Sequence, residues 1–272
     1  MAAVIGSDLE KVPGIVSAVV GRPGASPAYV RLPDAVHYAA STMKVAALVA
    51  AYRLDLDKPV PVRATFASAQ PGAPEFELAG PADDNDDAVW DRLGESVPLR
   101  WLARRMIVRS SNLATNLVLG EVGLPAVAEV WRAAGATASI VGRGIDDAAA
   151  RTAGITNQVT ARDLAALMSA LALGASGGHP IAGPAACAEM LDVLCAQEYR
   201  EDLSAGLPAG TRIATKNGCV TGVRHGAGVV FPGDAPPYTV VVCTTTPLPD
   251  EDACRLIAQI SAEAWAERAT LP

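Results

Sequence analysis

Apolar residues near the start of the chain predict extended structure after one helical turn. A capping-box pattern from Ser7 to Glu10 predicts a short helix over residues 7–11. The apolar run over residues 14–20 predicts a strand, and turn residues at 21–24 lead to a second extended run over 28–32. The first part of the chain therefore predicts a β-hairpin.

The middle of the chain has the spacing of helices. Residues 41–54 are apolar on most sides of a helix, which predicts a buried central helix. A Pro- and Gly-rich and then acidic stretch follows over residues 59–87. Beyond it, amphipathic patterns predict helices at about 98–109, 112–121, 125–134, 160–173 and 183–197.

The extended pattern returns near the C-terminus. Residues 211–215, 225–231 and 238–244 predict strands, and residues 250–267 predict a closing helix. Because strands at both ends flank a helical middle, we predict an α+β fold with one antiparallel sheet built from both ends of the chain. We expect a single domain over 1–272, with the α/β part at about 1–58 and 208–272 and an inserted all-α subdomain at about 59–207.

Composition narrows the class of protein. The 272 residues are 50% hydrophobic and 19% charged, which suffices for a sizeable core. The net charge of -7 opposes a nucleic acid or an anionic membrane as partner. No apolar run reaches the roughly 18 residues of a membrane span. We expect a soluble protein with a small-molecule substrate, and the pattern does not indicate an oligomeric state.

Cysteine and histidine usage predicts neither a metal nor a cofactor. The five cysteines show no C-x-x-C spacing, and the three histidines are scattered singly. The chain starts MAAVIGSDLE, without the basic and apolar regions of a secretory signal, so we expect free thiols and a cytoplasmic location.

The acidic run Asp83–Asp87 resembles the start of a calcium loop. It has Ala88 where that loop needs glycine and Gly94 where it needs a bidentate glutamate. We interpret the run as a solvated loop or a helix N-terminus.

One lysine stands in an unusual setting. Only four of the 22 basic residues are lysines, and Lys44 lies in the apolar helix three residues after Ser41. Positions i and i+3 share a helix face, so the amine can reach the hydroxyl. A buried lysine can lose its proton and act as a base, which arginine cannot do. The alternative is a serine N-cap followed by a lysine whose amine extends to solvent.

Two further motifs follow in order along the chain. Ser110-Ser111-Asn112 opens a predicted helix, and Lys216-Asn217-Gly218 ends the predicted strand 211–215. Taken alone, the first is also typical of a helix cap and the second of a turn at a strand end. Their occurrence together with Ser41-x-x-Lys44 favours a catalytic interpretation.

With these motifs the chain resembles the class A serine β-lactamases and their penicillin-recognising relatives, whose signatures are S-x-x-K, S-D-N and K-T-G. The resemblance extends from about Gly14 to the C-terminal helix. It includes the stretches 38–44, 106–116, 197–218 and 222–230. It implies a β-lactamase/transpeptidase-like fold, with a five-stranded antiparallel sheet flanked by helices, and an acyl-serine mechanism.

The resemblance also implies catalytic roles. Ser41 is the nucleophile, and neutral Lys44 is the base that accepts its proton. Desolvation and the cationic neighbour Lys216 keep the Lys44 amine neutral. Ser110, helped by Lys216, relays a proton to the leaving group.

Substrate-binding roles follow from the same resemblance. Asn112 holds the acyl-side amide of the substrate. Lys216, Asn217 and Gly218 line the opposite wall and attract a substrate carboxylate. The oxyanion hole consists of the N–H groups of Ser41 and Cys219, so Cys219 acts through its backbone.

The chain departs from the family pattern at three places. Ser111 replaces the middle aspartate of S-D-N, and Asn217 replaces a threonine or serine. The family's E-x-x-L-N motif, whose glutamate activates the deacylating water, has no counterpart in residues 143–151. Asp146 or Asp147 is a candidate replacement, and the alternative is a solvated carboxylate or a helix cap.

These features favour a cytoplasmic serine hydrolase that cleaves an ester or amide through an acyl-Ser41 intermediate, with weak activity on β-lactams. Three alternatives stay open. One is an acyltransferase that uses the same acyl-serine, another is a true class A β-lactamase, and the third is a non-catalytic binding module that has kept the fold.

Overall fold

The computed structural model describes residues 9–272. Ser7, which opens the predicted N-terminal helix, lies outside these residues. Leu9–Lys11 form a short 3-10 turn (η1).

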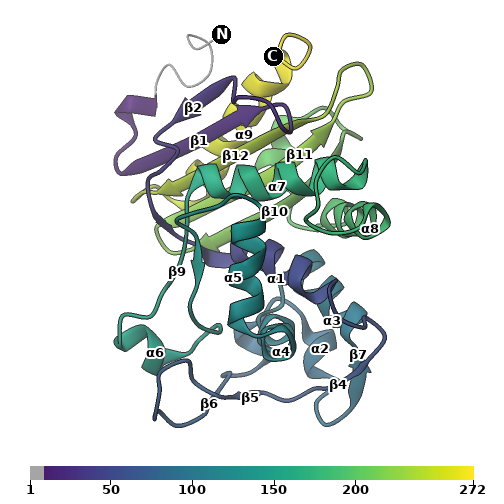
Figure 1. The fold of residues 1–272 in the computed structure, drawn as a ribbon. Helices are drawn as coiled ribbons and strands as arrows, with labels where there is room; N and C mark the ends of the chain where they lie inside the picture. Colours follow the sequence, from purple (N-terminus) through teal and green to yellow (C-terminus); the bar gives the residue numbers. More distant parts are fainter. Residues whose placement is uncertain (1–8) are drawn as a thin grey trace.

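A five-stranded antiparallel sheet joins the two ends of the chain, as predicted. Its strands are β1 (Ile15–Gly21), β2 (Tyr29–Arg31), β10 (Arg212–Val220), β11 (Val223–Phe231) and β12 (Tyr238–Thr245), in the order β10-β11-β12-β1-β2. In the centre, Val19 on β1 pairs with Val241 on β12. β10 is therefore an edge strand, and one side of its backbone faces the rest of the molecule (Figure 1).

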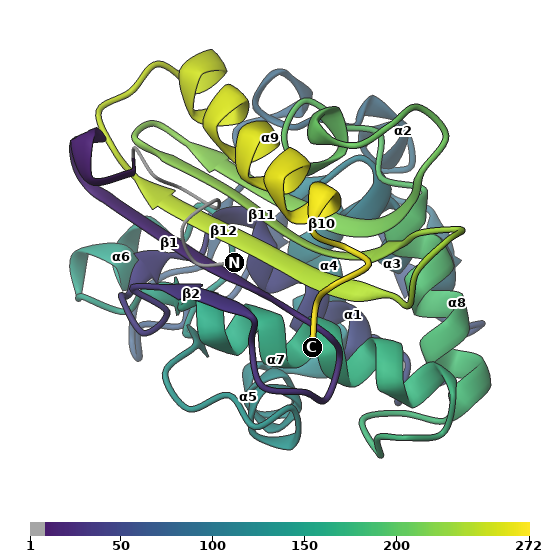
Figure 2. The same cartoon turned by 90° about the horizontal axis from the view of Figure 1, so that it is seen from above.

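Both faces of the sheet are covered because successive residues on a strand point to opposite sides. Val16, Ala18 and Val20 pack with Ile257 and Ile260 of α9 (Asp250–Ala266). Val19 belongs to the larger core on the other face, where α7 (Ala161–Ala175) lies against β1, β11 and β12. Figure 2 shows α9 across one face and α7 beneath the sheet.

The middle of the chain is helical, and its five longer helices have bounds close to those predicted, whereas the short helices over 87–90 and 148–152 are absent from the predictions. Its helices are α2 (Asp87–Trp90), α3 (Leu99–Val108), α4 (Asn112–Val122), α5 (Leu124–Ala133), α6 (Ala148–Thr152), α7 and α8 (Pro184–Cys195). Within residues 9–272 no single helix is both long and apolar enough to cross a membrane. Only α4 and α5 together pass on length and composition, and they are bent by 87°.

Several short elements are absent from the predictions. They are β3 (His37–Tyr38), β4 (Pro59–Pro61), β5 (Thr65–Phe66), β6 (Phe76–Glu77), β7 (Ser96–Pro98), β8 (Ile140–Val141), β9 (Asn157–Val159), η3 (Pro81–Asp83) and η4 (Leu203–Gly206). Strands of two or three residues are too short for a pattern of alternation to identify.

The predicted central helix is present but starts later. α1 (Lys44–Ala51) is buried along its whole length, and the 3-10 turn η2 (Ala40–Met43) precedes it. Ser41 therefore lies in this turn, just before the α-helix.

The expected strand end at Lys216-Asn217-Gly218 is wrong. β10 continues to Val220 because Asn217 and Gly218 pair with Gly226 and His225 of β11. The turn falls at Thr221-Gly222, where Gly222 has a φ of 78°. Ladder pairing overrides the local preference of Asn-Gly for a turn.

Candidate active site

The three motifs, which are far apart in the sequence, meet beside the edge strand β10. Ser41 on η2, Ser110 before α4, and Asn217 and Cys219 on β10 line one cleft of about 250 Å³. Its remaining lining residues are Asn85, Tyr199, Glu201 and Arg224, none of which the motifs predicted. The cleft therefore combines the candidate nucleophile with a charged wall from other segments.

The Lys44 amine is fully buried and turns toward the start of α4. It donates to the Ser110 carbonyl at 2.7 Å, to Ser110 Oγ at 3.2 Å and to Asn112 Oδ1 at 3.1 Å. Burial lowers the pKa of Lys44 to about 7, although the carboxylates of Asp84 and Asp146 act in the opposite direction. Much of the amine is therefore neutral at physiological pH.

The expected hydrogen bond between Lys44 and Ser41 is not formed in the described part of the chain. The amine instead satisfies the two acceptors of Ser110 and the side-chain oxygen of Asn112. Lys44 is thus placed beside the proposed proton relay.

Lys216 is also fully buried, and its amine turns back to its own strand. It donates to Asn217 O at 3.1 Å and to Asn217 Oδ1 at 2.9 Å. Burial, followed by the charge on Lys44, lowers the pKa of Lys216 well below its ordinary value. The amine that was expected to assist Ser110 and to attract a carboxylate thus donates to Asn217, and its environment disfavours the charged form.

Gln197 supports this arrangement, and the sequence analysis gave it no role. With its NH2 group donating to the carbonyls of Ile107 and Val108, its oxygen accepts from the Lys216 amine at 3.1 Å. The signal in the sequence is a glutamine that follows shortly after the apolar helix 184–195.

Ser110 is free to act because its neighbour provides the helix cap. The Ser111 hydroxyl accepts from Ala114 N at 3.1 Å and caps α4. Ser110 has a left-handed backbone with φ of 58°. Positive φ also occurs at Ala40 (44°), beside the nucleophile, and at Asp146 (62°). Such strain in non-glycine residues is typical of functional sites.

Asp84 provides the carboxylate that Ser111 lacks. It accepts from Asn112 N at 3.0 Å, from Leu113 N at 2.8 Å and from the Ser111 hydroxyl at 3.2 Å. The acidic run does lead into a helix, since Asp87 is the first residue of α2, and Asp84 accepts from the first residues of a different helix, α4. The solvated alternative fails at Asp86, which is buried and paired with Arg105.

Gly218 allows β10 to pass close to the nucleophile. A Cβ at this position would lie 3.2 Å from each of Ser41 N, Ala40 Cβ and Thr42 Cγ2. This proximity brings the following residue, Cys219, into the cleft with Ser41. Burial and a contact with Asp250 raise the pKa of the Cys219 thiol, so the side chain is not a thiolate.

The two candidate water activators have different environments. Asp147 is buried, caps α6 through Ala150 N, and accepts from Ser68 Oγ and Ala69 N at 2.7 Å each. Although burial alone would raise its pKa, these hydrogen bonds hold the pKa of Asp147 below the ordinary value. The Asp147 carboxylate therefore stabilises the fold, because its oxygens already accept from Ser68, Ala69 and Ala150.

Asp146 is more accessible but does not line the Ser41 cleft. It lines a separate cavity of about 450 Å³ with Tyr38, Arg143 and Arg151. Asn116 holds the preceding residue, Ile145, through two hydrogen bonds of 2.7 and 2.9 Å. Asp146 thus lies outside the lining of the Ser41 cleft, although its carboxylate is near enough to act on the pKa of Lys44.

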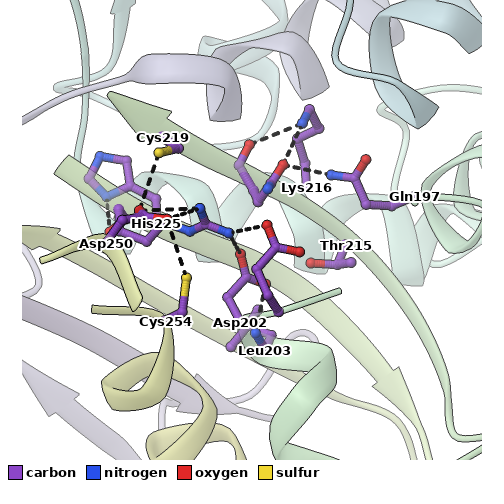
Figure 3. A network of polar contacts seen from close by, with 12 residues as sticks. Gln197, Asp202, Leu203, Thr215, Lys216, Cys219, His225, Asp250 and Cys254 are labelled. Atoms are coloured by element: carbon purple, nitrogen blue, oxygen red, sulfur yellow. Dashed lines mark hydrogen bonds and ion pairs between the residues drawn. The ribbon is translucent and has the colours of Figure 1, made fainter. Parts of the chain in front are cut away.

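Arg224 on β11 is the main residue that the motifs missed. It is only 4% exposed and pairs with Glu201 (2.7 Å), Asp202 (3.2 Å) and Asp250 (3.2 Å). Figure 3 shows this network beside Lys216, with Asp202, Asp250 and Cys219 labelled. An arginine within a strand that follows the lysine motif is a signal that could have identified it.

Metal-ligand geometry is absent from the described residues. Within residues 9–272 no group of three or more His, Cys, Asp or Glu side chains could hold a metal ion. All five cysteines are free. Two of the histidines are buried and structural, since His37 contacts Ser17 and Thr245 and His225 contacts the Tyr38 carbonyl.

Comparison with known proteins adds a family and a fold. A family model described as the beta-lactamase enzyme family matches residues 5–267. No curated protein matches the chain. A beta-lactamase from Sphaerobacter thermophilus is 24% identical, with a TM-score of 0.79 over 99% of this chain and 97% of that chain.

Two other similar structures have the same fold. A class A beta-lactamase of the last common ancestor of Gram-negative bacteria is 22% identical, with a TM-score of 0.79 over 97% of this chain and 99% of that chain. A variant of PBP-A, an acyl-enzyme complex with penicillin G, is 22% identical with a TM-score of 0.74 over 93% and 89%. At these identities the likeness shows the fold, which confirms the predicted architecture.

Proposed function

The chain belongs to the beta-lactamase enzyme family of serine hydrolases, and from this premise we propose that it cleaves an ester or amide bond of a small molecule through an acyl-Ser41 intermediate. The observation that carries the proposal is the shared cleft of Ser41 and Ser110, with a buried amine 3.2 Å from the Ser110 hydroxyl. The arrangement provides a nucleophile in Ser41, a base in Lys44 and a proton relay in Ser110.

In the acylation step, neutral Lys44 takes the proton of the Ser41 hydroxyl as the oxygen attacks the substrate carbonyl. The N–H groups of Ser41 and Cys219 stabilise the resulting oxyanion. The proton then passes from Lys44 to Ser110, and the Ser110 hydroxyl donates to the leaving group as its bond to the carbonyl carbon breaks. Removing one oxyanion-hole donor costs about 10²–10³ in rate in comparable sites.

Asn112 links this step to substrate binding. Its side-chain oxygen accepts from Lys44 at 3.1 Å, so its NH2 group is left for an acyl-side carbonyl of the substrate. Gly218 keeps β10 close enough to form the opposite wall. Asn217 accepts from Lys216 through its side-chain oxygen, so its NH2 group is also left to donate into the cleft that it lines.

The slow step is deacylation. Asp147 is held by three donors, and Asp146 lines a different cavity from Ser41. A β-lactam acyl-enzyme therefore lacks a positioned base for its water and persists. We propose activity on esters or activated amides, with only weak turnover of β-lactams.

The lack of a positioned base also favours acyl transfer as a second candidate function. An amine nucleophile needs less activation than water to attack an acyl-serine. Adding hydroxylamine to the ester reaction distinguishes the two. A transferase that binds its acceptor predicts a rate of hydroxamate formation that saturates with hydroxylamine concentration, whereas a hydrolase whose acyl-enzyme is trapped by free hydroxylamine predicts a rate that rises linearly.

The direct test of the proposal is intact-mass measurement of the acyl adduct. The protein is incubated with p-nitrophenyl esters and with a chromogenic cephalosporin, and the mass is followed over time. We expect an acyl mass that Ser41→Ala abolishes and that the exposed control Ser176→Ala retains. Absence of any adduct at Ser41 contradicts the proposal.

A cytoplasmic location is part of the same proposal. Five free cysteines, with Cys219 exposed in the described structure, fit a reducing compartment. Fractionation of the source cells with an antibody to the protein tests it, and recovery outside the cytoplasm contradicts it.

A further inference from the structure

The hydrogen-bonding capacity of the Arg224 guanidinium is already used. One terminal nitrogen donates to both oxygens of Asp250 at 3.2 and 3.3 Å. The other donates to Glu201 at 2.7 Å and to Asp202 at 3.2 Å. The remaining donor, Nε, is buried and has no partner. Arg224 therefore has no free terminal donor for a substrate carboxylate.

The charge around Arg224 is negative. Three carboxylates, of Glu201, Asp202 and Asp250, surround one guanidinium, and we call these three residues the acidic wall. The neighbouring Lys216 offsets them less than an ordinary lysine would, because burial and the charge on Lys44 lower its pKa well below the ordinary value. A family member that binds a substrate carboxylate needs the opposite sign of charge here.

Two members of the acidic wall, Glu201 and Asp250, are accessible near the reacting groups, whereas Asp202 is fully buried. Glu201 lines the same cleft as Ser41 and Ser110. Asp250 lines an adjoining cavity of about 480 Å³, which shares Cys219 and Arg224 with that cleft. The side chains of Glu201 and Asp250 are 47% and 57% exposed. Each can therefore contact a bound molecule while it remains paired with Arg224.

The proposed proton donor to the leaving group lines the same cleft as one member of the wall. Ser110 delivers the proton to the leaving group, and it shares its cleft with Glu201 and Arg224. We propose that the acidic wall selects substrates whose leaving group carries a cation and disfavours leaving groups that carry a carboxylate. This inference rests on the proposed acyl-Ser41 function and specifies its substrate class.

Three thioesters of phenylacetic acid test the inference. Their leaving thiols are thiocholine, its uncharged isostere 3,3-dimethylbutanethiol, and 3-mercaptopropionate. Ser41 Oγ bonds to the carbonyl carbon, the C–S bond breaks, and the thiol leaves with the proton from Ser110. Water then cleaves the acyl-serine to phenylacetate and regenerates the hydroxyl. Thiol release, separated by chromatography, gives kcat/KM for each ester.

We expect kcat/KM for the thiocholine ester to exceed that of the uncharged isostere by about tenfold, and the carboxylate ester to be slower by a similar factor. Raising the ionic strength should reduce both ratios. Equal rates for all three esters, or the reverse order, overturn the inference.

Charge-neutralising variants assign the effect to the wall. Glu201→Gln and Asp250→Asn should each reduce the preference for thiocholine several-fold. Glu251→Gln is the matched control, because Glu251 is adjacent to Asp250 but pairs with Arg255 instead of Arg224. A preference that survives in the Glu201→Gln/Asp250→Asn double variant overturns the assignment.

Intact-mass measurement of the acyl adduct on Ser41 distinguishes failure of the acidic-wall inference from failure of the proposed acyl-Ser41 function. Acylation by all three esters without a charge preference contradicts the acidic wall and leaves the proposed function standing. Thioester hydrolysis that persists in Ser41→Ala, or no acyl mass with any ester, contradicts the proposed function and the inference with it.

Discussion

The Lys44 amine lies 3.2 Å from the Ser110 hydroxyl, and within residues 9–272 no carboxylate accepts a hydrogen bond from it. A paired carboxylate would stabilise the protonated amine and remove its function as a base. Complete burial without such a partner lowers the pKa of the amine and so favours its neutral form, which can accept a proton. The position of Lys44 thus explains why a lysine, rather than an arginine, stands in an otherwise apolar helix.

Acylation should therefore depend on pH through Lys44. Its pKa is lowered to about 7 and only the neutral amine accepts a proton, so the rate should rise with pH and level off above that value. Below it, the rate should fall about tenfold per pH unit. Burst kinetics with an ester between pH 5.5 and 9 measure this profile.

Lys44→Arg provides the matched control, because arginine stays protonated throughout this range. We expect it to slow acylation by about 10²–10⁴, the usual contribution of a general base. An unchanged pH profile in this variant would show that another group accepts the proton.

Gly218→Ala should slow acylation more than it destabilises the protein. Its methyl group would lie 3.2 Å from Ser41 N, so β10 and η2 must move apart by a few tenths of an ångström. Small displacements of reacting groups have large effects on rate, and we expect a loss of about 10- to 100-fold. Gly183→Ala, where an added Cβ meets nothing within 4 Å, is the control. Equal effects of the two variants would contradict the close-approach argument.

Cys219→Ala should leave acylation within about threefold of the unmodified protein, since the proposed donor is the backbone N–H. The raised pKa of the thiol also removes it as a competing nucleophile. Steady-state kinetics with an ester, before and after treatment with a small alkylating reagent, measure this. A loss of more than 100-fold in the alanine variant would assign a role to the thiol itself.

Asp84→Asn should loosen the turn that carries Ser110. The substitution removes charge-assisted hydrogen bonds to Asn112 N and Leu113 N, and we expect unfolding to be easier by about 1–3 kcal/mol. Acylation should fall as well, because Ser110 and Asn112 hold Lys44. Urea denaturation and burst kinetics measure the two effects, with the exposed Asp83→Asn as control.

A second substitution tests whether Asp84 replaces the family aspartate. Ser111→Asp alone places two carboxylates together and should destabilise the protein. In the Asp84→Asn background the same substitution restores a cap and a carboxylate, so stability should recover. Additive losses in the double variant would refute the replacement.

Longer patterns in the sequence predicted the fold well. The strands of the main sheet other than the three-residue β2, and the helices from α3 to α9 other than the five-residue α6, have enough residues for a period of 2 or 3.6 to be visible. Asn217-Gly218 misled the prediction because pairing with β11 is a non-local interaction that outweighs turn preference. Motif spacing likewise placed Ser41, Ser110 and Cys219 in one cleft.

The electrostatics of the site could not be predicted in the same way. Whether Lys216 is charged depends on its burial and on the distance to Lys44, and these are properties of the tertiary structure. Asp84 and Arg224 act through contacts with segments distant in sequence. The periodicity of a single sequence predicts local helices and strands, but it does not predict which distant residues form contacts.

The fate of the acyl-enzyme distinguishes the remaining roles of Asp146 and Asp147. Asp147→Asn should lower stability, because Asp147 accepts from Ser68, Ala69 and Ala150, yet it should leave the lifetime of a β-lactam acyl-enzyme unchanged. Asp146→Asn should also leave that lifetime unchanged, since Asp146 lines a different cavity. Time-resolved intact mass after a pulse of cephalosporin measures each lifetime. A longer-lived adduct in Asp146→Asn alone would show that its carboxylate reaches the deacylating water, and the protein would then be a β-lactamase that uses an aspartate in place of the missing glutamate.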